Sequence, residues 1–403
     1  MLMKIITLPA TLLLILIFLA SSASPDHHRK FNVHDFGAKG DGITDDSKAF
    51  NEAWKRACNS WEKHVVVLVP NSKYMLKPVN FSGPCNSDQI TFKIKGKIVA
   101  SENRSDYEKD TEHWLVFEEI HNLRVDGGGT GIFDGKGRVW WQTSCKVNRS
   151  LPCTSLPYAV TFIGCTKLRV ENLKFRNAQK MHLSFERCEK VRALNLRLTA
   201  PEHSPNTDGI HVEGTHNINI RNCVMRTGDD CISIVSGSKN VRATDITCGP
   251  GHGISIGSLG ARNSSANVSN VFVNRAIFSG TTNGLRIKTW QGGSGYAKKI
   301  RFENITMHNV TNPIIIDQYY CDQVEPCQEQ VSAVQISKVV YRSIQGTSSA
   351  GEAIRFNCSK HFPCQGILLE DINLKSYGDV RQSAKASCSN VKFKIKGKAS
   401  PSC

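Results

Sequence analysis

Thr166-Lys-Leu-Arg-Val-Glu-Asn-Leu173 is one copy of a pattern that recurs along this chain. Two polar residues come first, then an aliphatic residue, and then polar and apolar side chains alternate. Further copies begin at Glu189, His216, Lys239 and Lys298. Alternation with a period of two is typical of a β-strand that buries one face, so each copy predicts a strand.

The spacing of these copies predicts how the strands stack. Successive aliphatic anchors are 23 to 34 residues apart, and each interval has room for two or three short strands with their turns. The anchors are Leu168, Val191, Ile218, Val241, Val271, Ile300, Val334 and Ile367. Leucine-rich repeats need a repeated leucine and asparagine ladder, propeller blades need about 40 residues, and neither pattern is present. We therefore expect an all-β fold, a single-domain right-handed parallel β-helix, whose longer coils after Val241 place their extra residues in turns beside a groove.

One amphipathic segment, from Thr44 to Cys58, predicts a helix. Thr44 or Asp45 is placed to cap it, and Asp45 and Asp46 suit the positive end of a helix dipole. Its apolar face comprises Ala49, Phe50, Ala53, Trp54 and Ala57.

The N-terminus predicts a secretory signal peptide over residues 1–23, which leaves residues 24–403 as the folded domain. Lys4 precedes an apolar run from Leu12 to Ala20, and Ser21-Ser-Ala23 offers small residues for cleavage. A membrane anchor is the alternative, but it needs roughly 20 apolar residues, and this run is shorter.

Secretion favours disulfide bonds, and the chain has 15 cysteines, an odd number that leaves at least one thiol unpaired. Close pairs predict local staples at Cys321 with Cys327, Cys358 with Cys364, and Cys231 with Cys248. Cys165 and Cys188 lie in similar contexts on successive repeats, either bonded or free. Some Asn-x-Ser/Thr sites are expected to carry glycans. These sites are Asn80, Asn103, Asn148, Asn263, Asn267, Asn304, Asn309 and Asn357.

The formal net charge of +16 attracts polyanions over long range. The basic residues are scattered along the strands, and no helix-turn-helix or aromatic RNA-binding motif is present, so we expect no nucleic-acid partner. An acidic polysaccharide fits a secreted cationic protein best. The alternative is that the charge serves solubility or loose adhesion.

Three carboxylates and one imidazole recur at a spacing that matches the repeat. Asp208 lies 21 residues before Asp229, and His252 lies 23 residues after it. A repeat of this length stacks such side chains on neighbouring coils. Asp230 can face the same cleft only if the backbone bends, because adjacent strand residues point to opposite faces, and Gly228 is placed to allow the bend. Such a cluster predicts a catalytic site or, alternatively, a site for a divalent cation.

Two cations follow about one enlarged coil later. Arg286 and Lys288 are two residues apart and therefore share a strand face, where a guanidinium and an ammonium together suit a carboxylate ligand. Tyr320 lies 34 residues beyond Arg286 and is a weaker candidate. His182 and His211 also fall on alternating strands, and we interpret both as structural.

Glycoside hydrolysis needs two carboxyl groups, one protonated to assist the leaving oxygen and one ionised to activate water or attack carbon. A third carboxylate nearby raises the proton affinity of its neighbour, which keeps an acid protonated. Asp208, Asp229 and Asp230 supply such a set.

Four motifs together resemble those of the polygalacturonases, the pectin-cleaving glycoside hydrolases of family 28. The motifs are Asn206-Thr-Asp208, Gly228-Asp-Asp230, Gly251-His-Gly253 and Arg286-Ile-Lys288, in this order. The resemblance extends from Phe31 to Cys403 and is nearest to the plant type. It implies the same β-helix, with the N-terminal helix covering one end, and it matches the Cys231–Cys248 pairing.

The resemblance also implies roles for the site residues. Asp229 is then the general acid, Asp208 and Asp230 position and deprotonate the attacking water, and His252 tunes Asp229. The substrate-binding residues are then Asn206, Arg286, Lys288 and Tyr320. The implied reaction is hydrolysis of α-1,4-galacturonan with inversion, without metal or cofactor, by a secreted monomer that acts on pectin in the cell wall.

Three alternatives stay open on the sequence. A calcium-dependent pectate lyase eliminates rather than hydrolyses, a rhamnogalacturonan hydrolase cleaves a different backbone, and a non-catalytic wall protein only binds pectin. The Arg286 and Lys288 pair favours a carboxylate in the reacting subsite and so disfavours the second of these.

Overall fold

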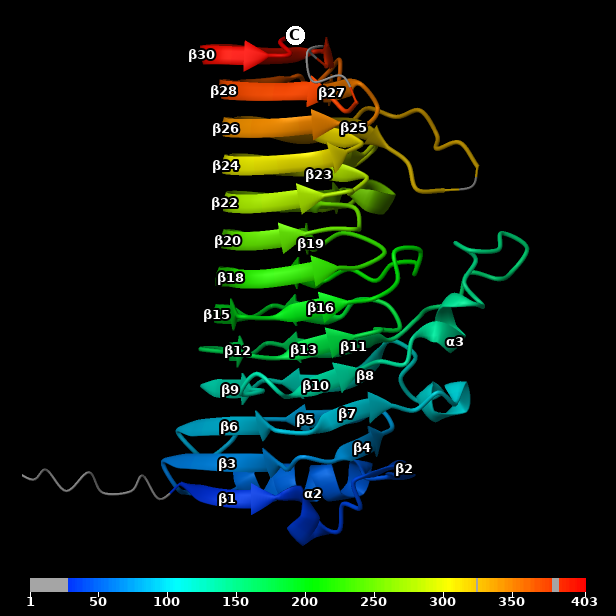
Figure 1. Cartoon of the computed structure of the whole chain (residues 1–403), viewed down its shortest axis with the longest axis vertical. Coiled ribbons are helices and arrows are strands. Elements are labelled where there is room, and N and C mark those ends of the chain that lie inside the picture. Colours follow the sequence, from blue (N-terminus) through cyan, green and yellow to red (C-terminus); the bar gives the residue numbers. More distant parts are fainter. Residues whose placement is uncertain (1–27, 324, 379–383) are drawn as a thin grey trace, which may run out of the picture.

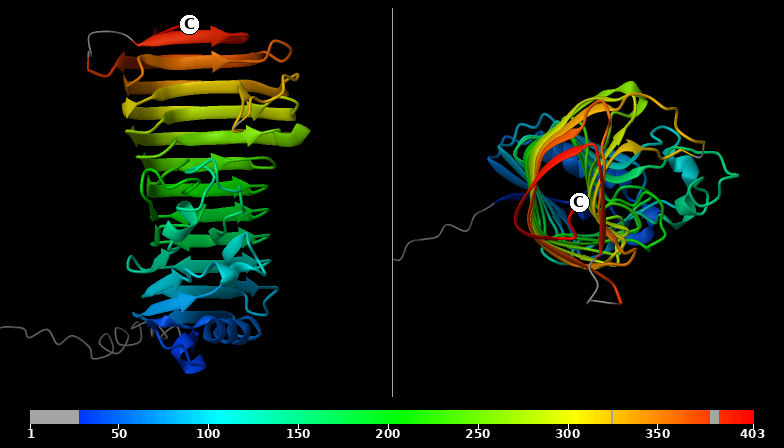
Figure 2. Two further views of the ribbon diagram at one scale, coloured as in Figure 1. Left: turned by 90° about the vertical axis from the view of Figure 1, so that its right-hand side faces the viewer. Right: turned by 90° about the horizontal axis from the view of Figure 1, so that it is seen from above.

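The fold is a right-handed parallel β-helix, as the repeat predicts (Figures 1 and 2). The computed structural model describes residues 28–323, 325–378 and 384–403, so the predicted signal peptide lies outside the described residues. Strands from successive coils pair in parallel register, and the coils stack into an elongated column with β1 at one end and β30 at the other (Figure 1).

Within the described residues, the strands form two sheets on opposite sides of one core. The larger sheet comprises β1 (Arg29–Asn32), β2 (Asp41–Asp45), β3 (His64–Val69), β4 (Lys73–Leu76), β6 (Gln89–Ile94), β7 (Lys97–Ala100), β9 (Leu123–Asp126), β10 (Ile132–Asp134), β12 (Arg169–Glu171), β13 (Lys174–Arg176), β15 (Glu189–Leu194), β16 (Arg197–Thr199), β18 (His216–Arg226), β20 (Lys239–Cys248), β22 (Ser265–Ser279), β24 (Ser294–Val310), β26 (Ala333–Ser348), β28 (Cys364–Ser376) and β30 (Val391–Ser400). The smaller sheet comprises β5 (Val79–Ser82), β8 (His113–Glu118), β11 (Tyr158–Ile163), β14 (Leu183–Glu186), β17 (Ile210–Glu213), β19 (Ile232–Ile234), β21 (Ile254–Leu259), β23 (Asn283–Trp290), β25 (Asn312–Tyr320), β27 (Glu352–Asn357) and β29 (Lys385–Ser389).

The aliphatic anchors stack as expected, with one correction. Ile218 pairs with Val241, and Val241 pairs with Val271. Ile300, however, pairs with Val339 rather than with the predicted Val334. The prediction was wrong by five residues because Val334 lies before the left-handed turn at Lys338 and pairs with Gly295 instead.

A residue with a left-handed backbone conformation directly precedes each observed anchor and bends the chain there. Lys338, for example, has a φ of 56° directly before Val339. Asparagine tolerates this conformation well, and at these turns its amides also stack. Asn270 Nδ2 donates to Asn240 Oδ1 at 2.6 Å, and Asn240 Nδ2 donates to Asn217 Oδ1 at 2.8 Å. The expectation that the chain lacks an asparagine ladder was therefore wrong.

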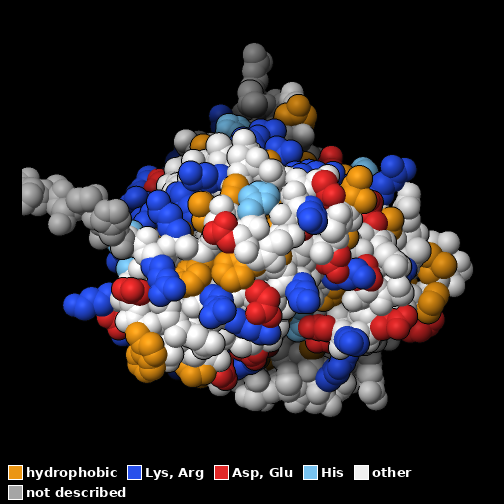
Figure 3. Space-filling view, turned by 90° about the horizontal axis from the view of Figure 1, so that it is seen from below, with side chains coloured by type: hydrophobic (Ala, Val, Ile, Leu, Met, Phe, Trp, Pro, Cys, Tyr) orange, Lys and Arg blue, Asp and Glu red, His pale blue; other side chains and the backbone are white. Residues whose placement is uncertain are grey.

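The predicted capping helix is α2 (Ser47–Cys58), and it covers the end of the core beside β1 (Figure 1). Its predicted apolar face is buried. Its N-cap is Asp46 rather than Thr44 or Asp45, and the Asp46 carboxylate accepts from the backbone of Lys39 and Gly40 instead of from the helix. Figure 3 views this end, where charged side chains surround scattered hydrophobic ones.

The other helices of the described residues are short. They are α3 (Arg138–Trp141) and the 3-10 turns η1 (Val33–Phe36), η2 (Arg104–Tyr107) and η3 (Ala261–Asn263). None of the described helices has the length and apolar character needed to cross a bilayer.

All three predicted disulfides are present, and three more join them. The additional pairs are Cys58–Cys85, Cys145–Cys153 and Cys388–Cys403. Cys165 and Cys188 are free and buried, as is Cys223.

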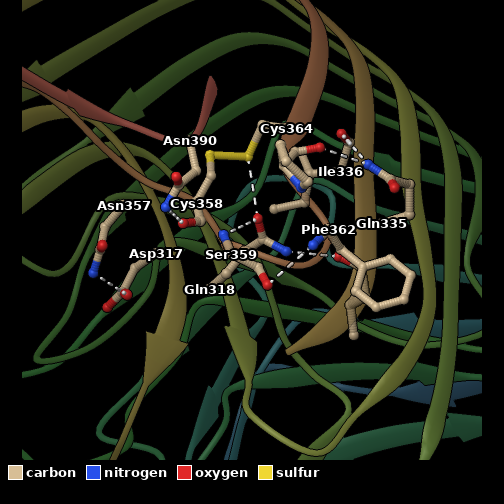
Figure 4. The surroundings of a disulfide bond; sticks show 12 residues. Asp317, Gln318, Gln335, Ile336, Asn357, Cys358, Ser359, Phe362, Cys364 and Asn390 are labelled. Carbon is tan, nitrogen blue, oxygen red and sulfur yellow. Dashed lines mark hydrogen bonds between the residues drawn. A yellow bond between two sulfur atoms is a disulfide. The ribbon is translucent and has the colours of Figure 1, made fainter. Parts of the chain in front are cut away.

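Around Cys358–Cys364 the chain is held by polar contacts as well (Figure 4). The buried Gln318 amide accepts from the Ser359 backbone at 3.0 Å, and Asn390 Nδ2 donates to the Cys358 carbonyl at 3.0 Å.

Candidate active site

The four predicted chemical residues lie on three neighbouring coils. Asp208, Asp230 and His252 each stand two residues before a strand of the smaller sheet, namely β17, β19 and β21. These strands pair in register through their isoleucines, so the residues at equivalent positions are Asp208, Asp230 and His252, and the predicted stacking was wrong by one residue at Asp229.

The backbone at Gly228 comes very close to a neighbouring segment. A side chain at this position would place its Cβ 2.0 Å from the carbonyl oxygen of Ser204. The Gly228 N–H donates to the Thr207 hydroxyl at 2.9 Å. Glycine is required here by this close approach, which seats Asp229 and Asp230 against the coil that carries Asp208.

Asp229 and His252 form a hydrogen-bonded ion pair. His252 Nδ1 lies 2.9 Å from Asp229 Oδ1, and Asn206 Nδ2 donates to Asp229 Oδ2 at 3.3 Å. Burial raises the pKa of Asp229, but the hydrogen bond and charge of His252 outweigh burial and lower that pKa to about 2. The hydrogen bond with Asp229 raises the pKa of His252.

Asp230 is buried between the two predicted cations. Arg286 Nη2 lies 2.8 Å from Asp230 Oδ1, and Lys288 Nζ lies 3.1 Å from Asp230 Oδ2. Ser255 Oγ donates to Asp230 Oδ1 at 2.8 Å and accepts from Arg286 Nε at 2.9 Å. The negative charge of the carboxylate and the positive charges of the two cations therefore compensate each other at a site with little access to solvent.

Asp208 is the carboxyl group of the site whose surroundings most favour the protonated form. Burial raises its pKa well above the ordinary value, and the charges of Asp229 and Asp230 raise it further. The surroundings thus favour the protonated forms of Asp208 and His252 and the ionised form of Asp229.

These residues line an open cavity of about 400 Å³. Arg286 and Lys288 face it from β23, and Lys288 Nζ lies 5.2 Å from the centre of the Tyr320 ring, which packs edge-on against Trp290. All eight predicted site residues border this cavity.

Sequence reasoning missed three titratable residues of the cavity wall. His211, expected to be structural, lines it because it shares an outward row with Ser233, Ser255 and Arg286. Its Nδ1 lies 2.8 Å from Ser233 Oγ. Lys146 and Asp322, which come from long turns, also line the cavity. His182, by contrast, is buried against backbone carbonyls.

Asp229, Asp230 and His252 place potential metal-ligand atoms within 4.8 Å of one another. Their donor atoms already bind other groups of the protein, since His252 and Asp229 bind each other and Asp230 binds two cations. A divalent ion there would lie beside Arg286 and Lys288, so the set suits proton transfer better than metal binding.

The sequence pattern described as "Glycosyl hydrolases family 28" matches residues 58–403. This chain belongs to that family. The family 28 hydrolase is 60% identical to "Polygalacturonase QRT2" of Arabidopsis thaliana over 377 residues, which cover 93% of this chain and 84% of that protein. It is 57% identical to "Polygalacturonase" of Persea americana, with 91% and 78% covered. The predicted family and its plant type are confirmed.

A solved structure supports the fold of the family 28 hydrolase. An exopolygalacturonase from Thermotoga maritima superposes with a TM-score of 0.71 at 21% identity, with 92% of each chain covered.

The contact between His252 and Asp229 makes the stability of the family 28 hydrolase depend on pH. Because the pKa of Asp229 is lowered to about 2, its contribution is present above about pH 4 and is lost as the pH falls to about 2. Because the pKa of His252 is raised, its contribution is present below about pH 6.5 and is lost as the pH rises through the raised value. We expect urea unfolding of His252→Gln and wild type to differ most between pH 4 and 6. A difference of constant size from pH 2 to 8 would contradict this, and His308→Gln at an exposed position is the matched control.

The disulfide Cys231–Cys248 joins the residue after Asp230 to the end of β20, four residues before His252, and it closes a loop with a sequence separation of 17. We expect Cys231→Ser/Cys248→Ser to lower the free energy of unfolding by about 3 kcal/mol, the value for a loop of this size. Thermal unfolding checks this. The double variant Cys321→Ser/Cys327→Ser opens a loop with a separation of only 6 and should cost less.

Proposed function

We propose that this chain is a polygalacturonase that hydrolyses α-1,4-galacturonosidic linkages of pectin with inversion. The observation that carries the proposal is the arrangement of three carboxyl groups beside Arg286 and Lys288 in one cavity. Carboxyl groups supply the acid and base for glycoside cleavage, and the two cations suit a substrate that is itself a carboxylate. The named polygalacturonases among its relatives support the same substrate.

In the proposed mechanism, Asp229 protonates the glycosidic oxygen. In the free site the pKa of His252 is raised and that of Asp229 is lowered, which favours that proton on the imidazole, 2.9 Å from the carboxylate. The pair therefore shares one proton, which passes from the imidazole to the carboxyl as the leaving oxygen accepts it. His252 tunes the acid in this way, and Asn206 orients the second oxygen of Asp229.

Water attacks the anomeric carbon from the opposite face. Asp230 accepts the proton of this water, and the protonated Asp208 positions it. Arg286 and Lys288 grip the substrate carboxylate, which draws their charge away from Asp230 and makes its oxygens better proton acceptors. One C–O bond forms as the glycosidic C–O bond breaks, and the configuration inverts.

We propose further that the mature protein, residues 24–403, acts as a secreted monomer in the cell wall. The net charge of +16 favours attraction to an anionic polysaccharide. Tyr320, next to Lys288, offers a ring face to a sugar. The chemistry needs no metal or cofactor, because the carboxyl groups supply both proton transfers.

Product analysis on de-esterified polygalacturonan with a chelator present tests the proposal. We expect saturated oligomers with new reducing ends. Unsaturated products would indicate a lyase, cleavage confined to rhamnogalacturonan would indicate a sister hydrolase, and binding without cleavage would indicate a wall-binding protein. Each of these outcomes contradicts the proposed function.

A further inference from the structure

Two segments from distant coils meet beside the cavity. Lys146 lies in the segment between α3 and β11, and Asp322 directly follows β25. Lys146 Nζ and Asp322 Oδ1 form an ion pair at 2.7 Å although 176 residues separate them. Both side chains line the cavity that holds Asp229 and Lys288.

The segments that carry this ion pair are attached on either side of the strands that bear the site residues. In the smaller sheet, β14, β17, β19, β21 and β23 lie between β11 and β25. At about 4.8 Å per strand, the attachment points are roughly 29 Å apart along the column. The segment after α3 projects from the same side of the column as the segment after β25 and lies in front of the middle coils (Figures 1 and 2).

The groove continues on the other side of Asp322. A second cavity of about 470 Å³ is lined by Asp322, Trp290 and Gln291 together with other amide side chains. Because Asp322 borders both cavities, a polysaccharide that fills both must pass Asp322, the partner of Lys146. A short oligomer can occupy the catalytic cavity alone.

We propose that the Lys146–Asp322 ion pair is a latch across the groove that must open before a long polymer can occupy both cavities. The inference rests on the proposed function. Lys146 and Asp322 are then specificity-determining residues, which set the preference between polymer and short oligomer.

The chemistry of the pair suits a latch. The side chains are 43% and 51% exposed, and exposed ion pairs favour the closed state by only about two- to fivefold. The latch therefore opens often, and substrate carboxylates compete with Asp322 for Lys146. The disulfides Cys145–Cys153 and Cys321–Cys327 constrain the backbone beside Lys146 and beside Asp322. The same ion pair can therefore form again each time the latch closes.

The test compares the cleavage rate on long polygalacturonan with that on a trimer at 0.15 M salt, for wild type, Lys146→Gln, Asp322→Asn and the exchanged pair Lys146→Asp/Asp322→Lys. A latch predicts that both single variants raise the polymer-to-trimer ratio about two- to fivefold. The exchanged pair should restore the wild-type ratio. Glu52→Gln, which breaks the exposed Lys55–Glu52 pair on α2, is the matched control and should leave the ratio unchanged.

The two single variants change the charge of the groove in opposite directions. If Lys146 only attracts the polyanion, Lys146→Gln lowers the ratio and Asp322→Asn raises it, and this result overturns the latch. Equal ratios in all proteins also overturn it. A wild-type protein that cleaves neither substrate overturns the proposed function, and the latch with it, and is thus distinct from the other outcomes.

Discussion

Asp229→Asn is expected to lower kcat on polygalacturonan by about 10²- to 10⁴-fold, because the variant removes the group that protonates the leaving oxygen. Substrate binding should change little, since Asn206 and His252 can both bond to the new amide. The measurement is the release of reducing ends at saturating substrate. Asp245→Asn is the matched control, because this aspartate lies in an exposed left-handed turn that asparagine tolerates.

The protonation of the free site makes a second assay necessary. Burial and the neighbouring carboxylates raise the pKa of Asp208 well above its ordinary value, so Asp208 is the rival general acid. A galacturonosyl fluoride needs no proton on its leaving group and therefore restores activity to a variant that lacks only the acid. We expect it to rescue Asp229→Asn and not Asp208→Asn. Rescue of Asp208→Asn and not of Asp229→Asn would show that Asp208, rather than Asp229, is the general acid.

Asp230→Asn is expected to lose both activity and stability. The activity falls by about 10²- to 10⁴-fold because the variant lacks the proton acceptor for water. The free energy of unfolding falls by about 3 kcal/mol or more, because Arg286 and Lys288, 13% and 10% exposed, are left as buried cations without their partner.

The comparison with Asp229→Asn separates these two effects. His252 is 40% exposed and can release its proton when Asp229 is neutralised, so that variant should lose only the contribution of the His252–Asp229 pair and should be destabilised less than Asp230→Asn. Chemical unfolding of the two variants side by side measures the difference. Equal stability of Asp230→Asn and wild type would show that the cations do not depend on Asp230.

The repeat made most of the fold predictable, because an anchor row must recur once per coil if it is to stay buried. The prediction failed at Val334, because polar and apolar residues alternate as regularly around Val334 as around the correct anchor, Val339. The left-handed turn at Lys338 changes which residues face inward, and no single strand reveals such a turn. The N-cap of α2 was missed because the Asp46 carboxylate binds the backbone of the preceding residues Lys39 and Gly40 rather than that of the helix.

The site residues were predictable where they lie on adjacent coils. Asp208, Asp229, Asp230 and His252 recur at the coil length, and the structure brings them together. Lys146 and Asp322 were not predictable, because contacts between long turns depend on their path through space. The shift of the proton toward His252 likewise depends on a 2.9 Å contact and on burial, which spacing does not specify.

The most direct test of the central claim is the configuration of the first product. Proton NMR should follow early cleavage of a galacturonan oligomer with a chelator present. Direct attack of water, positioned by Asp208 and Asp230, predicts a saturated product that appears first as the β-anomer and then equilibrates. A product that appears first as the α-anomer, or an unsaturated product, would contradict the account.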